Sequence, residues 1–573
     1  MRREMVIRIR VITGIVLFLA LILLFRLYCL QVSQNDFYTD RAERQYVHTK
    51  QDLYSRGSIF FTTKDGEKVS AASIRSGFLL AFNPTIITDP NAVCEKLQPF
   101  LKVEKERCLE KASLKERTYV EIDLTIPDEI AEQIENLDLD GVQLYRNQWR
   151  YYPGDDLTAK VIGFVGYTEK TDDDLHGKYG LERYYDDVLV RDREVRSVNF
   201  FAEIFSNLGD MVYSKEESSP KGDVVTTIEP TVARMLDSVL LETNARYESK
   251  MTGAIIMDPK TGAIYAMNAV PGFNLNDRGT TTVEFFQNPL VENVYEFGST
   301  IKALTMAAGL DSGAINRHST YFDAGSITLN TFTIKNYDGK GRGTVEMQEV
   351  LNQSLNTGVS YIVQKMGKEK FREYFYNFKL GSETGIDQPN EAFGLIENLK
   401  SPRDVEYATA SFGQGIALTP IATIRALATL GNGGYLVTPH LASAIEYEDG
   451  TVKEILHPKG AQVISKESSE EISRMLTTVV DEALGKGKFK MQNYTIGAKT
   501  GTAQIADPNG GGYYEDKYLH SFFGYFPAFD PKFIVFMYTV EPKGVKYASE
   551  TLTEPFMDIA KFLINYYTIP PDR

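Results

Sequence analysis

The sequence predicts a multidomain α+β protein with a single N-terminal transmembrane helix and a C-terminal domain in which helices sandwich an antiparallel sheet. Three observations support this fold class. The 573 residues leave room for two or three domains, and the composition is ordinary, with 43% hydrophobic and 24% charged residues. A basic stretch and an apolar run open the chain, and helical and strand patterns alternate in its C-terminal part. We place the divisions at 1–35, 36–220 and 221–573.

The N-terminus predicts an uncleaved membrane anchor. Residues 1–10 hold four arginines against one acid, and the apolar run Val11–Leu30 contains a single arginine. Its length matches the roughly 20 residues that a spanning helix needs. A cleaved signal peptide and a lipoprotein signal are the alternatives, but LYCLQVSQND has no small-x-small cleavage site, and bulky residues precede Cys29. The arginine excess places the N-terminus in the cytoplasm and the rest of the chain outside.

Composition excludes several classes of function. A formal net charge of -15 argues against nucleic-acid binding, which needs clustered Lys and Arg. The six histidines are far apart and form no HExxH pattern, so we expect no metal and no cofactor. Cys94 and Cys108 lie fourteen residues apart. An external compartment permits a disulfide between them, and two free thiols are the alternative.

The elements after the anchor follow from their residue patterns. A polar, charged stretch up to about Gly57 predicts a helix. Residues 56–220 then mix short strands and helices. The hydrophilic stretch SKEESSPKGD (214–223) predicts a domain boundary. Pro230 at an early helical position then opens a helix with apolar residues at helical spacing. A β-hairpin is expected over 253–270, further strands over 494–505, 521–529 and 533–540, and a closing helix over 553–567.

Three short motifs occur in order: Ser299-Thr300-Ile301-Lys302 (SxxK), Ser354-Leu355-Asn356 (SxN) and Lys499-Thr500-Gly501 (KTG). Each is short enough to arise by chance, and the chain holds further copies of all three. The copies are Ser218–Lys221, Ser33–Asn35, Ser197–Asn199 and Lys260–Gly262. The surrounding sequence distinguishes the three candidate motifs from these copies. Pro220 interrupts the SxxK copy, the SxN copies lie beside the membrane or ahead of Ser299, and the KTG copy falls in the predicted hairpin turn.

Ser299 and Lys302 have the spacing of a nucleophile and its base. The stretch TIKALTMAAGL is rich in Ala and Leu and predicts a helix with Ser299 at or near its N-terminus. Residues i and i+3 share a helix face, so the Lys302 amine can reach the Ser299 hydroxyl. Lysine accepts that proton when burial, or a second cation such as Lys499, destabilises its ammonium. A plain N-cap serine is the simpler alternative for Ser299.

The SxN motif would supply a proton carrier and a substrate contact. Ser354 can pass a proton toward a leaving amine, and the Asn356 amide can hold a substrate peptide group. A loop that caps the next helix is the simpler alternative.

The KTG motif predicts a strand that binds substrate. The charge of Lys499 with the hydroxyls of Thr500 and Thr502 makes a receptor for a peptide carboxylate. Gly501 lets another backbone or a substrate approach closely. The Thr502 N–H, together with that of Ser299, can form an oxyanion hole.

In this order the three motifs resemble those of the penicillin-binding proteins and serine β-lactamases. Other stretches are similar to the class B penicillin-binding proteins: RGSIF (56–60), YYPGDDLTAKVIGFVG (151–166), YGLERYYDDVL (179–189), TGAIYAMNAVPGFNLN (261–276) and SFGQGIALTPIATIRALATLGNGG (411–434). Length and short loops favour the septal division type, FtsI, over the elongation type. Departures occur at Phe297, where the family often has Pro, in FFTTKDG (60–66) and in YDDVLVRD (185–192). They bear on partner contacts and subtype and leave the reacting groups intact.

The resemblance implies a two-step acyl transfer outside the bacterial cytoplasmic membrane. Ser299 would attack the carbonyl between two D-alanines of a peptidoglycan stem peptide, and an amine from a neighbouring strand would resolve the acyl-enzyme. β-Lactam antibiotics would acylate Ser299 as substrate mimics. Residues 36–220 would form an elongated, non-catalytic pedestal of the dimerisation type. The anchor would pack on a polytopic glycosyltransferase, alongside other division or elongation proteins.

Several rival interpretations use the same motifs. A D,D-carboxypeptidase or another hydrolase of this fold has the same reacting groups, although the anchor and the large N-terminal region disfavour a secreted β-lactamase. A bifunctional wall synthase needs a further catalytic region before residue 220, and a penicillin-sensing receptor needs further spans and a zinc protease. The sequence shows neither. From a different class, the chain could be a catalytically inactive division scaffold, but all the reacting residues are present.

Overall fold

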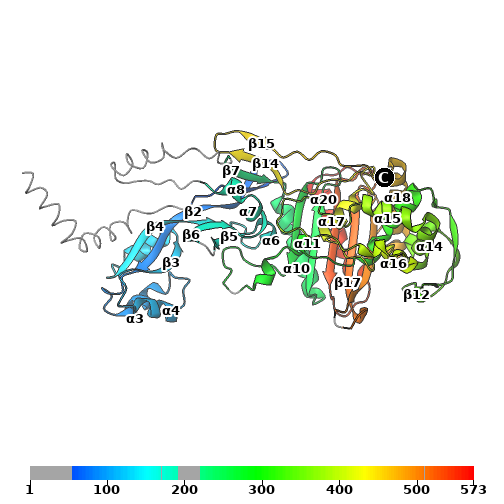
Figure 1. Cartoon of the computed structure of the whole chain (residues 1–573). Helices are drawn as coiled ribbons and strands as arrows, with labels where there is room; N and C mark the ends of the chain where they lie inside the picture. Colours follow the sequence, from blue (N-terminus) through cyan, green and yellow to red (C-terminus); the bar gives the residue numbers. More distant parts are fainter. Residues whose placement is uncertain (1–54, 169–170, 192–219, 280, 509) are drawn as a thin grey trace, which may run out of the picture. The chain divides into compact units, whose positions relative to one another are not determined.

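The computed structural model of the chain describes residues 55–168, 171–191, 220–279, 281–508 and 510–573 (Figure 1). The predicted anchor, the polar helix after it and most of the SKEESSPKGD break lie outside the described residues. No helix within the described ranges is long and apolar enough to cross a membrane. Because residues 192–219 also lie outside the described ranges, the predicted domain boundary at residue 220 stays a prediction.

The described residues form two compact units. The smaller contains Arg75–Trp149, and the larger contains Arg56–Ile74, Arg150–Arg191 and the described part of Ser219–Arg573. The long strand β2 (Lys68–Phe82) contributes to both units, because its first residues pair with β1 and its last residues pair with β3.

The smaller unit packs three short helices with antiparallel strands. Its elements besides β2 are α3 (Pro90–Leu97), α4 (Lys105–Ala112), β3 (Val120–Ile126), α5 (Asp128–Glu135) and most of β4 (Val142–Tyr151). Fully buried Leu80, Phe82 and Leu97 lie in its core. Cys94 on α3 and Cys108 on α4 form a disulfide, which decides between the two alternatives that the sequence left open.

The larger unit begins with strands from distant parts of the chain, which belong to the same seven-stranded sheet as β2 and β3. β7 (Gly222–Thr226) pairs in parallel with β1 (Ile59–Thr62) and antiparallel with β14 (Ala442–Tyr447), which pairs in turn with β15 (Val452–Glu454). Beside it lie α6 (Ala159–Ile162), β5 (Val165–Thr168), β6 (Thr171–Gly177), α7 (Gly180–Tyr184) and α8 (Asp186–Leu189).

A fully buried carboxylate connects this region. The two oxygens of Glu182 each accept a hydrogen bond of 2.6 Å, one from Nε of Arg56 and one from Nε of Arg150. Charge-assisted bonds of this kind are stronger than neutral ones, and they compensate the cost of burying the ions. Glu182 therefore ties RGSIF to YGLERYYDDVL, two stretches on which the resemblance rests.

The predicted antiparallel sheet is confirmed. Its strand order is β16-β17-β18-β8-β9, and every neighbouring pair is antiparallel. The strands are β8 (Met251–Met257), β9 (Ile264–Val270), β16 (Gly497–Ala506), β17 (Tyr513–Phe526) and β18 (Phe533–Val540). All eight residues of β18 are buried, so helices must cover both faces of the sheet at its centre.

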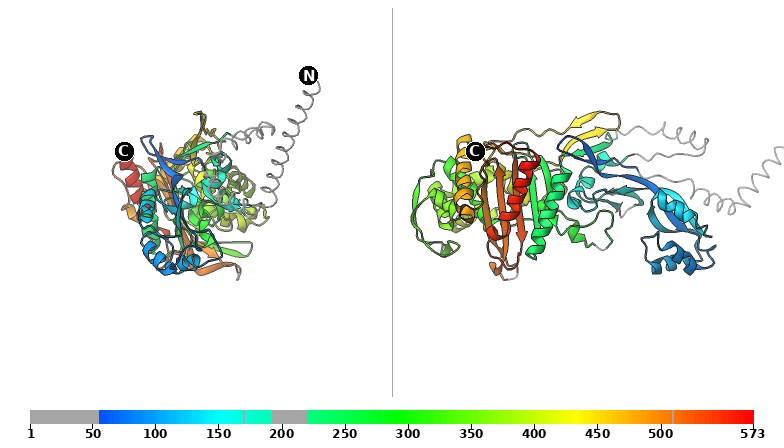
Figure 2. Two further views of the ribbon diagram at one scale, coloured as in Figure 1. Left: turned by 90° about the vertical axis from the view of Figure 1, so that its left-hand side faces the viewer. Right: turned by 180° about the vertical axis from the view of Figure 1, so that it is seen from behind.

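Helices cover the two faces as the sequence predicts. On one face lie α10 (Pro230–Arg246) and the closing helix α20 (Thr553–Tyr566), drawn green and red across the sheet in the right-hand view of Figure 2. α11 (Pro289–Glu292), α17 (Pro420–Ala428) and α18 (Lys466–Thr478) pack on the strands from the opposite side. α10 begins as expected, with Pro230 in its first turn and the Glu229 side chain accepting from the Val232 N–H.

The remaining elements build a helical region next to strand β16. They are α12 (Lys302–Asp311), α13 (Met347–Asn352), α14 (Asn356–Met366), α15 (Lys368–Asn377) and α16 (Asp404–Ala410), with the strand pairs β10 (Thr320–Asp323) and β13 (Gly343–Glu346), and β11 (Ser326–Leu329) and β12 (Phe332–Lys335). α19 (Ala548–Thr551) precedes α20.

Candidate active site

Ser299 lies in a tight turn immediately before α12. The turn is a 3-10 helix, Gly298–Thr300, so the predicted helix start is confirmed, with a tighter first turn than expected. Gly298 has φ +58°, and its N–H donates to the Gly413 carbonyl oxygen at 3.2 Å. A Cβ at position 298 would also lie 2.7 Å from the Thr502 carbonyl oxygen. Glycine is required here both for the backbone conformation and for the close approach of β16.

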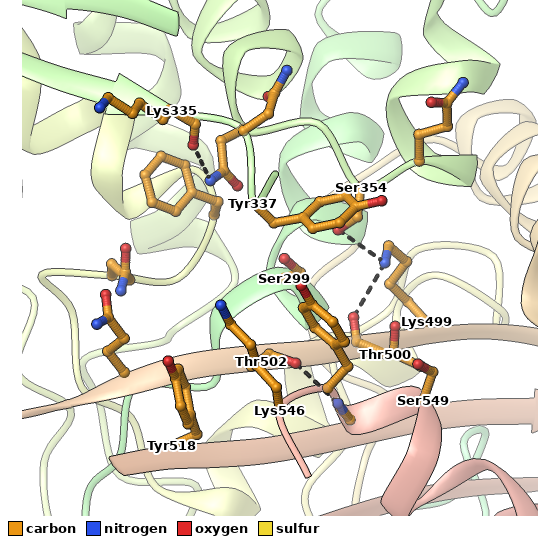
Figure 3. Close-up of a pocket in the computed structure, with 18 of the residues that line it drawn as sticks. Ser299, Lys335, Tyr337, Ser354, Lys499, Thr500, Thr502, Tyr518, Lys546 and Ser549 are labelled. Atoms are coloured by element: carbon orange, nitrogen blue, oxygen red, sulfur yellow. Dashed lines mark hydrogen bonds between the residues drawn. The ribbon is translucent and has the colours of Figure 1, made fainter. Parts of the chain in front are cut away.

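The hydroxyl of Ser299 opens into a cleft of about 910 Å³ (Figure 3). Of the residues selected from sequence, Ser299, Ser354, Asn356, Lys499, Thr500 and Thr502 line this cleft. The Ser299 hydroxyl has no hydrogen-bond partner among the described residues and is accessible from the cleft. Lys302 lies behind the cleft surface, and Gly501 does not line it.

The Lys302 amine is completely buried and contacts Ser354. Its Nζ donates to the Ser354 carbonyl oxygen at 2.6 Å and to Ser354 Oγ at 3.1 Å. Burial, and next to it the charge of Lys499, hold the pKa of Lys302 well below its ordinary value. Lys302 is thus an amine that gives up its proton more readily than an ordinary lysine. Its transfer of a proton from Ser299 stays a prediction, because its hydrogen bonds in this structure go to Ser354.

Ser354 stands between two amines. Lys499 Nζ, only 4% exposed on β16, donates to Ser354 Oγ at 3.2 Å and to the Thr500 carbonyl oxygen at 3.2 Å. Burial lowers the pKa of Lys499 to about 8. When both lysines donate, the two lone pairs of Ser354 Oγ are engaged and its O–H is left for another acceptor. Ser354 is held in the left-handed region at φ +52°, a strained conformation typical of functional sites.

Asn356 is the first residue of α14 and faces the cleft from the other wall. Its Nδ2 donates to the Lys335 carbonyl oxygen at 2.8 Å, which leaves the side-chain oxygen available for a substrate N–H. Neither Ser354 nor Asn356 caps α14 through its side chain, because the N-cap is Leu355. The motif thus lies at the start of α14, as the simpler alternative expects, but its side chains do not cap the helix.

A buried polar cluster fixes this wall. Asp323, on β10 and 1% exposed, accepts from Asn336 Nδ2 at 3.0 Å and from Thr357 Oγ1 at 2.8 Å. Asn336 Oδ1 in turn accepts from the Thr357 N–H at 3.2 Å. The cluster joins the start of α14 to the end of β12, so it positions Asn356 against Lys335. Sequence reasoning missed these residues, because none of them belongs to a motif that the sequence analysis singled out.

β16 is an edge strand of the sheet, and its free edge runs past the nucleophile turn. A Cβ on Gly501 would lie 2.4 Å from the Phe297 carbonyl oxygen and 2.4 Å from Ser521 Oγ. The sequence predicted that either another backbone or a substrate would approach Gly501 closely. In the structure it is the backbone of Phe297. Thr502 Oγ1 accepts from the Ala548 N–H at 3.0 Å, which joins β16 to α19.

This contact gives a first prediction. Gly501→Ala forces the nucleophile turn away from β16, because the nearest atoms are packed backbone and a hydrogen-bonded hydroxyl. We expect acylation by a fluorescent penicillin to slow by about tenfold or more, and the free energy of unfolding to fall by about 1–3 kcal/mol. Gly272→Ala is the matched control, since no heavy atom would lie within 4 Å of its Cβ. Wild-type acylation by Gly501→Ala would show that the contact does not position Ser299.

One of the other motif copies, the second KTG, is fully described, and it does not line the cleft. Lys260–Gly262 occupies the turn between β8 and β9, as predicted, and Lys260 pairs with Asp530. The copies Ser33–Asn35 and Ser197–Asn199 lie outside the described residues, as does the serine of Ser218–Lys221. Among the described residues, no group of three or more His, Cys, Asp or Glu side chains is placed to hold a metal ion.

Several cleft residues have no sequence motif. They are Phe332, Lys335, Tyr337, Tyr518, Lys546 and Tyr547. The rings of Tyr337 and Tyr547 meet edge to face, with centroids 5.9 Å apart, although they lie 210 residues apart in sequence. Only the tertiary fold brings them together, so no local pattern could have identified them.

Comparison with known families decides the identity of the catalytic unit. Residues 252–561 match the family of the penicillin binding protein transpeptidase domain, and residues 55–225 match the penicillin-binding protein dimerisation domain. The chain belongs to the penicillin-binding proteins. All three motifs fall within the matched transpeptidase domain of this penicillin-binding protein.

Curated relatives cover almost the whole penicillin-binding protein. Stage V sporulation protein D of Bacillus subtilis (strain 168) is 30% identical over 557 residues, which are 95% of this chain and 83% of the relative. Peptidoglycan D,D-transpeptidase FtsI of Escherichia coli (strain K12) is 25% identical over 575 residues, covering 99% of this chain and 92% of the relative.

A solved structure shares the fold of this penicillin-binding protein. Penicillin Binding Protein 2X from Streptococcus thermophilus matches with a TM-score of 0.70 at 21% identity, covering 90% of this chain and 80% of the other. The two proteins thus share the α+β multidomain fold despite their low sequence identity.

Proposed function

We propose that this chain is a membrane-anchored peptidoglycan D,D-transpeptidase that cross-links stem peptides through an acyl-enzyme on Ser299. The observation that carries the proposal is the meeting of one open hydroxyl, Ser299, with the Lys302–Ser354–Lys499 amine and hydroxyl cluster at a single cleft. Acyl transfer needs a nucleophile beside an amine that can be neutral near pH 7 and a fixed positive charge for the substrate carboxylate. Ser299 and Lys499 on the cleft wall, with Lys302 behind it, would supply these groups.

In the first step, Ser299 Oγ bonds to the carbonyl carbon between two D-alanines, and its proton passes to neutral Lys302. The C–N bond then breaks, and the terminal D-alanine leaves as an amine after gaining a proton by way of Ser354. Lys499, with Thr500 and Thr502, would hold the carboxylate of that D-alanine. The N–H groups of Ser299 and Thr502 would stabilise the oxyanion of the tetrahedral intermediate.

In the second step, an amine of a neighbouring strand attacks the acyl carbon, loses a proton to the site and releases Ser299. Water in place of the amine would give a D,D-carboxypeptidase, which remains the alternative within this fold. β-Lactams would acylate Ser299 as carbonyl analogues that carry a carboxylate. This agrees with a structural neighbour, Penicillin binding protein 3 from Mycobacterium tuberculosis, whose structure is described as complexed with aztreonam.

The cellular setting is part of the proposal. A role in septal rather than lateral wall synthesis is supported by the FtsI relative and the length of the chain. The basic and apolar residues 1–35 would anchor the chain with its N-terminus in the cytoplasm, and 36–220 would serve as the pedestal for the catalytic domain 221–573. The Cys94–Cys108 disulfide supports an oxidising, external location. A polytopic glycosyltransferase would be the partner of the anchor.

The test uses the purified full-length chain, its anchor in detergent, with a lipid-linked disaccharide pentapeptide and a polymerising glycosyltransferase. Chromatography of the digested product is expected to reveal cross-linked dimers together with released D-alanine. D-Alanine release without any dimer would replace the transpeptidase with a carboxypeptidase. Neither product, together with no penicillin labelling, would favour an inactive scaffold.

The pKa of Lys499 gives a second prediction. The amine carries its charge below a pKa of about 8 and loses it above. If this charge holds the D-alanine carboxylate, kcat/KM for peptide substrates falls about tenfold per pH unit above that value. Lys499→Gln should remove this alkaline limb and lower kcat/KM by about 10²-fold, whereas Lys260→Gln, in the second KTG, should change neither. An unchanged alkaline limb in Lys499→Gln would assign it to another group.

A further inference from the structure

The cleft around Ser299 carries charge of one sign only, in a chain whose formal net charge is -15. Its described lining residues include Lys335, Lys499 and Lys546 and contain no Asp and no Glu. A hollow lined by charge of one sign attracts ligands of the opposite charge. The terminal D-alanine carboxylate that Lys499 would bind gives a role to only one of these three lysines.

Lys546 is held at a defined position on the cleft wall. Its carbonyl oxygen accepts from Nε2 of the buried His520 at 3.0 Å, and two residues later the Ala548 N–H donates to Thr502 Oγ1 at 3.0 Å. These two bonds fix the backbone at Lys546 against β17 and β16. Figure 3 shows the Lys546 side chain extending from this wall toward the middle of the cleft, with Lys335 on the opposite wall.

The Lys546 amine is available to a ligand, because no carboxylate among the described residues forms an ion pair with it. Acids on adjoining segments have other partners. Glu550 accepts from the Tyr547 N–H at 3.3 Å, and Glu541 pairs with Lys517 at 3.5 Å. Asp338, next to lining residue Tyr337 but itself outside the lining, pairs with Arg342 at 2.8 Å.

We propose that Lys546 forms a subsite for a second carboxylate of the donor stem peptide, distinct from the D-alanine carboxylate that Lys499 would hold. The subsite rests on the proposed function, since it presupposes a stem peptide in this cleft. Two positions of the peptide can supply such a group: the free α-carboxylate of a γ-linked second residue, or a side-chain carboxylate on the third residue. Either way, the preferred donor is an acidic peptide, and amidation of the recognised group weakens it.

The test compares three synthetic pentapeptides ending in D-Ala-D-Ala. The first has a γ-linked D-glutamate and a diaminopimelate, both with free carboxylates. The second is amidated at the glutamate α-carboxylate, and the third at the diaminopimelate side-chain carboxylate. The full-length protein in detergent is acylated by each peptide in competition with a fluorescent penicillin, and D-alanine release is measured in parallel.

We expect the wild type to react about fivefold faster with the unamidated peptide than with one of the two amides, and the identity of that amide locates the carboxylate. Lys546→Met should abolish this ratio, and Lys546→Arg should restore it. Lys543→Met is the matched control, a lysine three residues away that pairs with Glu248. It should retain the wild-type ratio.

Two outcomes would overturn the subsite alone: equal acylation of the wild type by all three peptides, or a wild-type ratio in Lys546→Met. Failure of every peptide to acylate Ser299 or release D-alanine would instead overturn the transpeptidase function and the subsite with it.

Discussion

Ser299→Ala is expected to abolish both cross-link formation and D-alanine release, with rates at least about 10⁴-fold below those of the wild type. The substitution removes the atom that would form the acyl bond and leaves the rest of the site in place. Ser299 has no hydrogen-bond partner among the described residues, so its loss breaks no contact within that part of the fold. We expect the melting temperature to stay within a few degrees of the wild type. The assay is dimer formation from lipid-linked substrate, with fluorescent-penicillin labelling in parallel.

Ser238→Ala provides the control for this experiment. Ser238 is an exposed serine on α10 that does not line the cleft, and its hydroxyl donates to the Arg234 carbonyl oxygen at 3.1 Å. It should label and cross-link as the wild type does. Stoichiometric penicillin labelling that persists in Ser299→Ala would remove Ser299 from the role of nucleophile.

Lys302→Met is expected to slow acylation by about 10²- to 10⁴-fold, the usual contribution of a general base. Methionine fills the volume of the buried lysine stem without its amine. The pKa of Lys302 is well below the ordinary lysine value, so wild-type acylation should rise with pH as that amine becomes neutral. In Lys302→Met this rise should disappear. The measurement is the second-order rate of penicillin acylation from pH 5 to 9 by stopped flow.

A structural role for Lys302 makes a different prediction. If the amine only held Ser354, Lys302→Met would lower the acylation rate equally at every pH and leave the shape of the profile unchanged. Because Lys302→Met leaves the Ser354 carbonyl oxygen without this donor, we expect the free energy of unfolding to fall by about 1–3 kcal/mol. Near wild-type acylation in Lys302→Met would reject the general-base assignment.

Local pattern was enough to predict the strands of the antiparallel sheet in outline and the helices α10 and α20, although β17 begins at Tyr513, eight residues before the predicted start. β18 falls where an unbroken apolar run stands in the sequence, and α10 starts at the proline that marks its first turn. The β8–β9 hairpin was also predictable, because its turn residues separate two strand-like runs. These elements depend on neighbours in sequence. The pairing of β7 with β1 and β14 depends on segments more than 150 residues apart, and no local pattern specifies it.

The residues of the candidate site likewise fall into a group that could be predicted from local sequence and a group that could not. Motif order and helix context identified the serine, the lysines and the amide that meet at the cleft. The hydrogen bond from Lys302 to Ser354 was not predictable from sequence. The two residues lie 52 positions apart, and Ser354 has a left-handed backbone that no local pattern indicates. The walls formed by Tyr337, Tyr547 and Lys546 were missed for a related reason: they are exposed residues in loops, and only the packing of α19 against β16 brings two of them to the cleft.

One measurement tests the central assignment most directly. The full-length protein is incubated with benzylpenicillin, digested, and the peptide that carries the adduct is sequenced by mass spectrometry. We predict a single adduct on Ser299, at a stoichiometry near one per chain. An adduct on Ser354 or on any residue outside the cleft, or no adduct at all on a folded protein, would contradict the proposed mechanism.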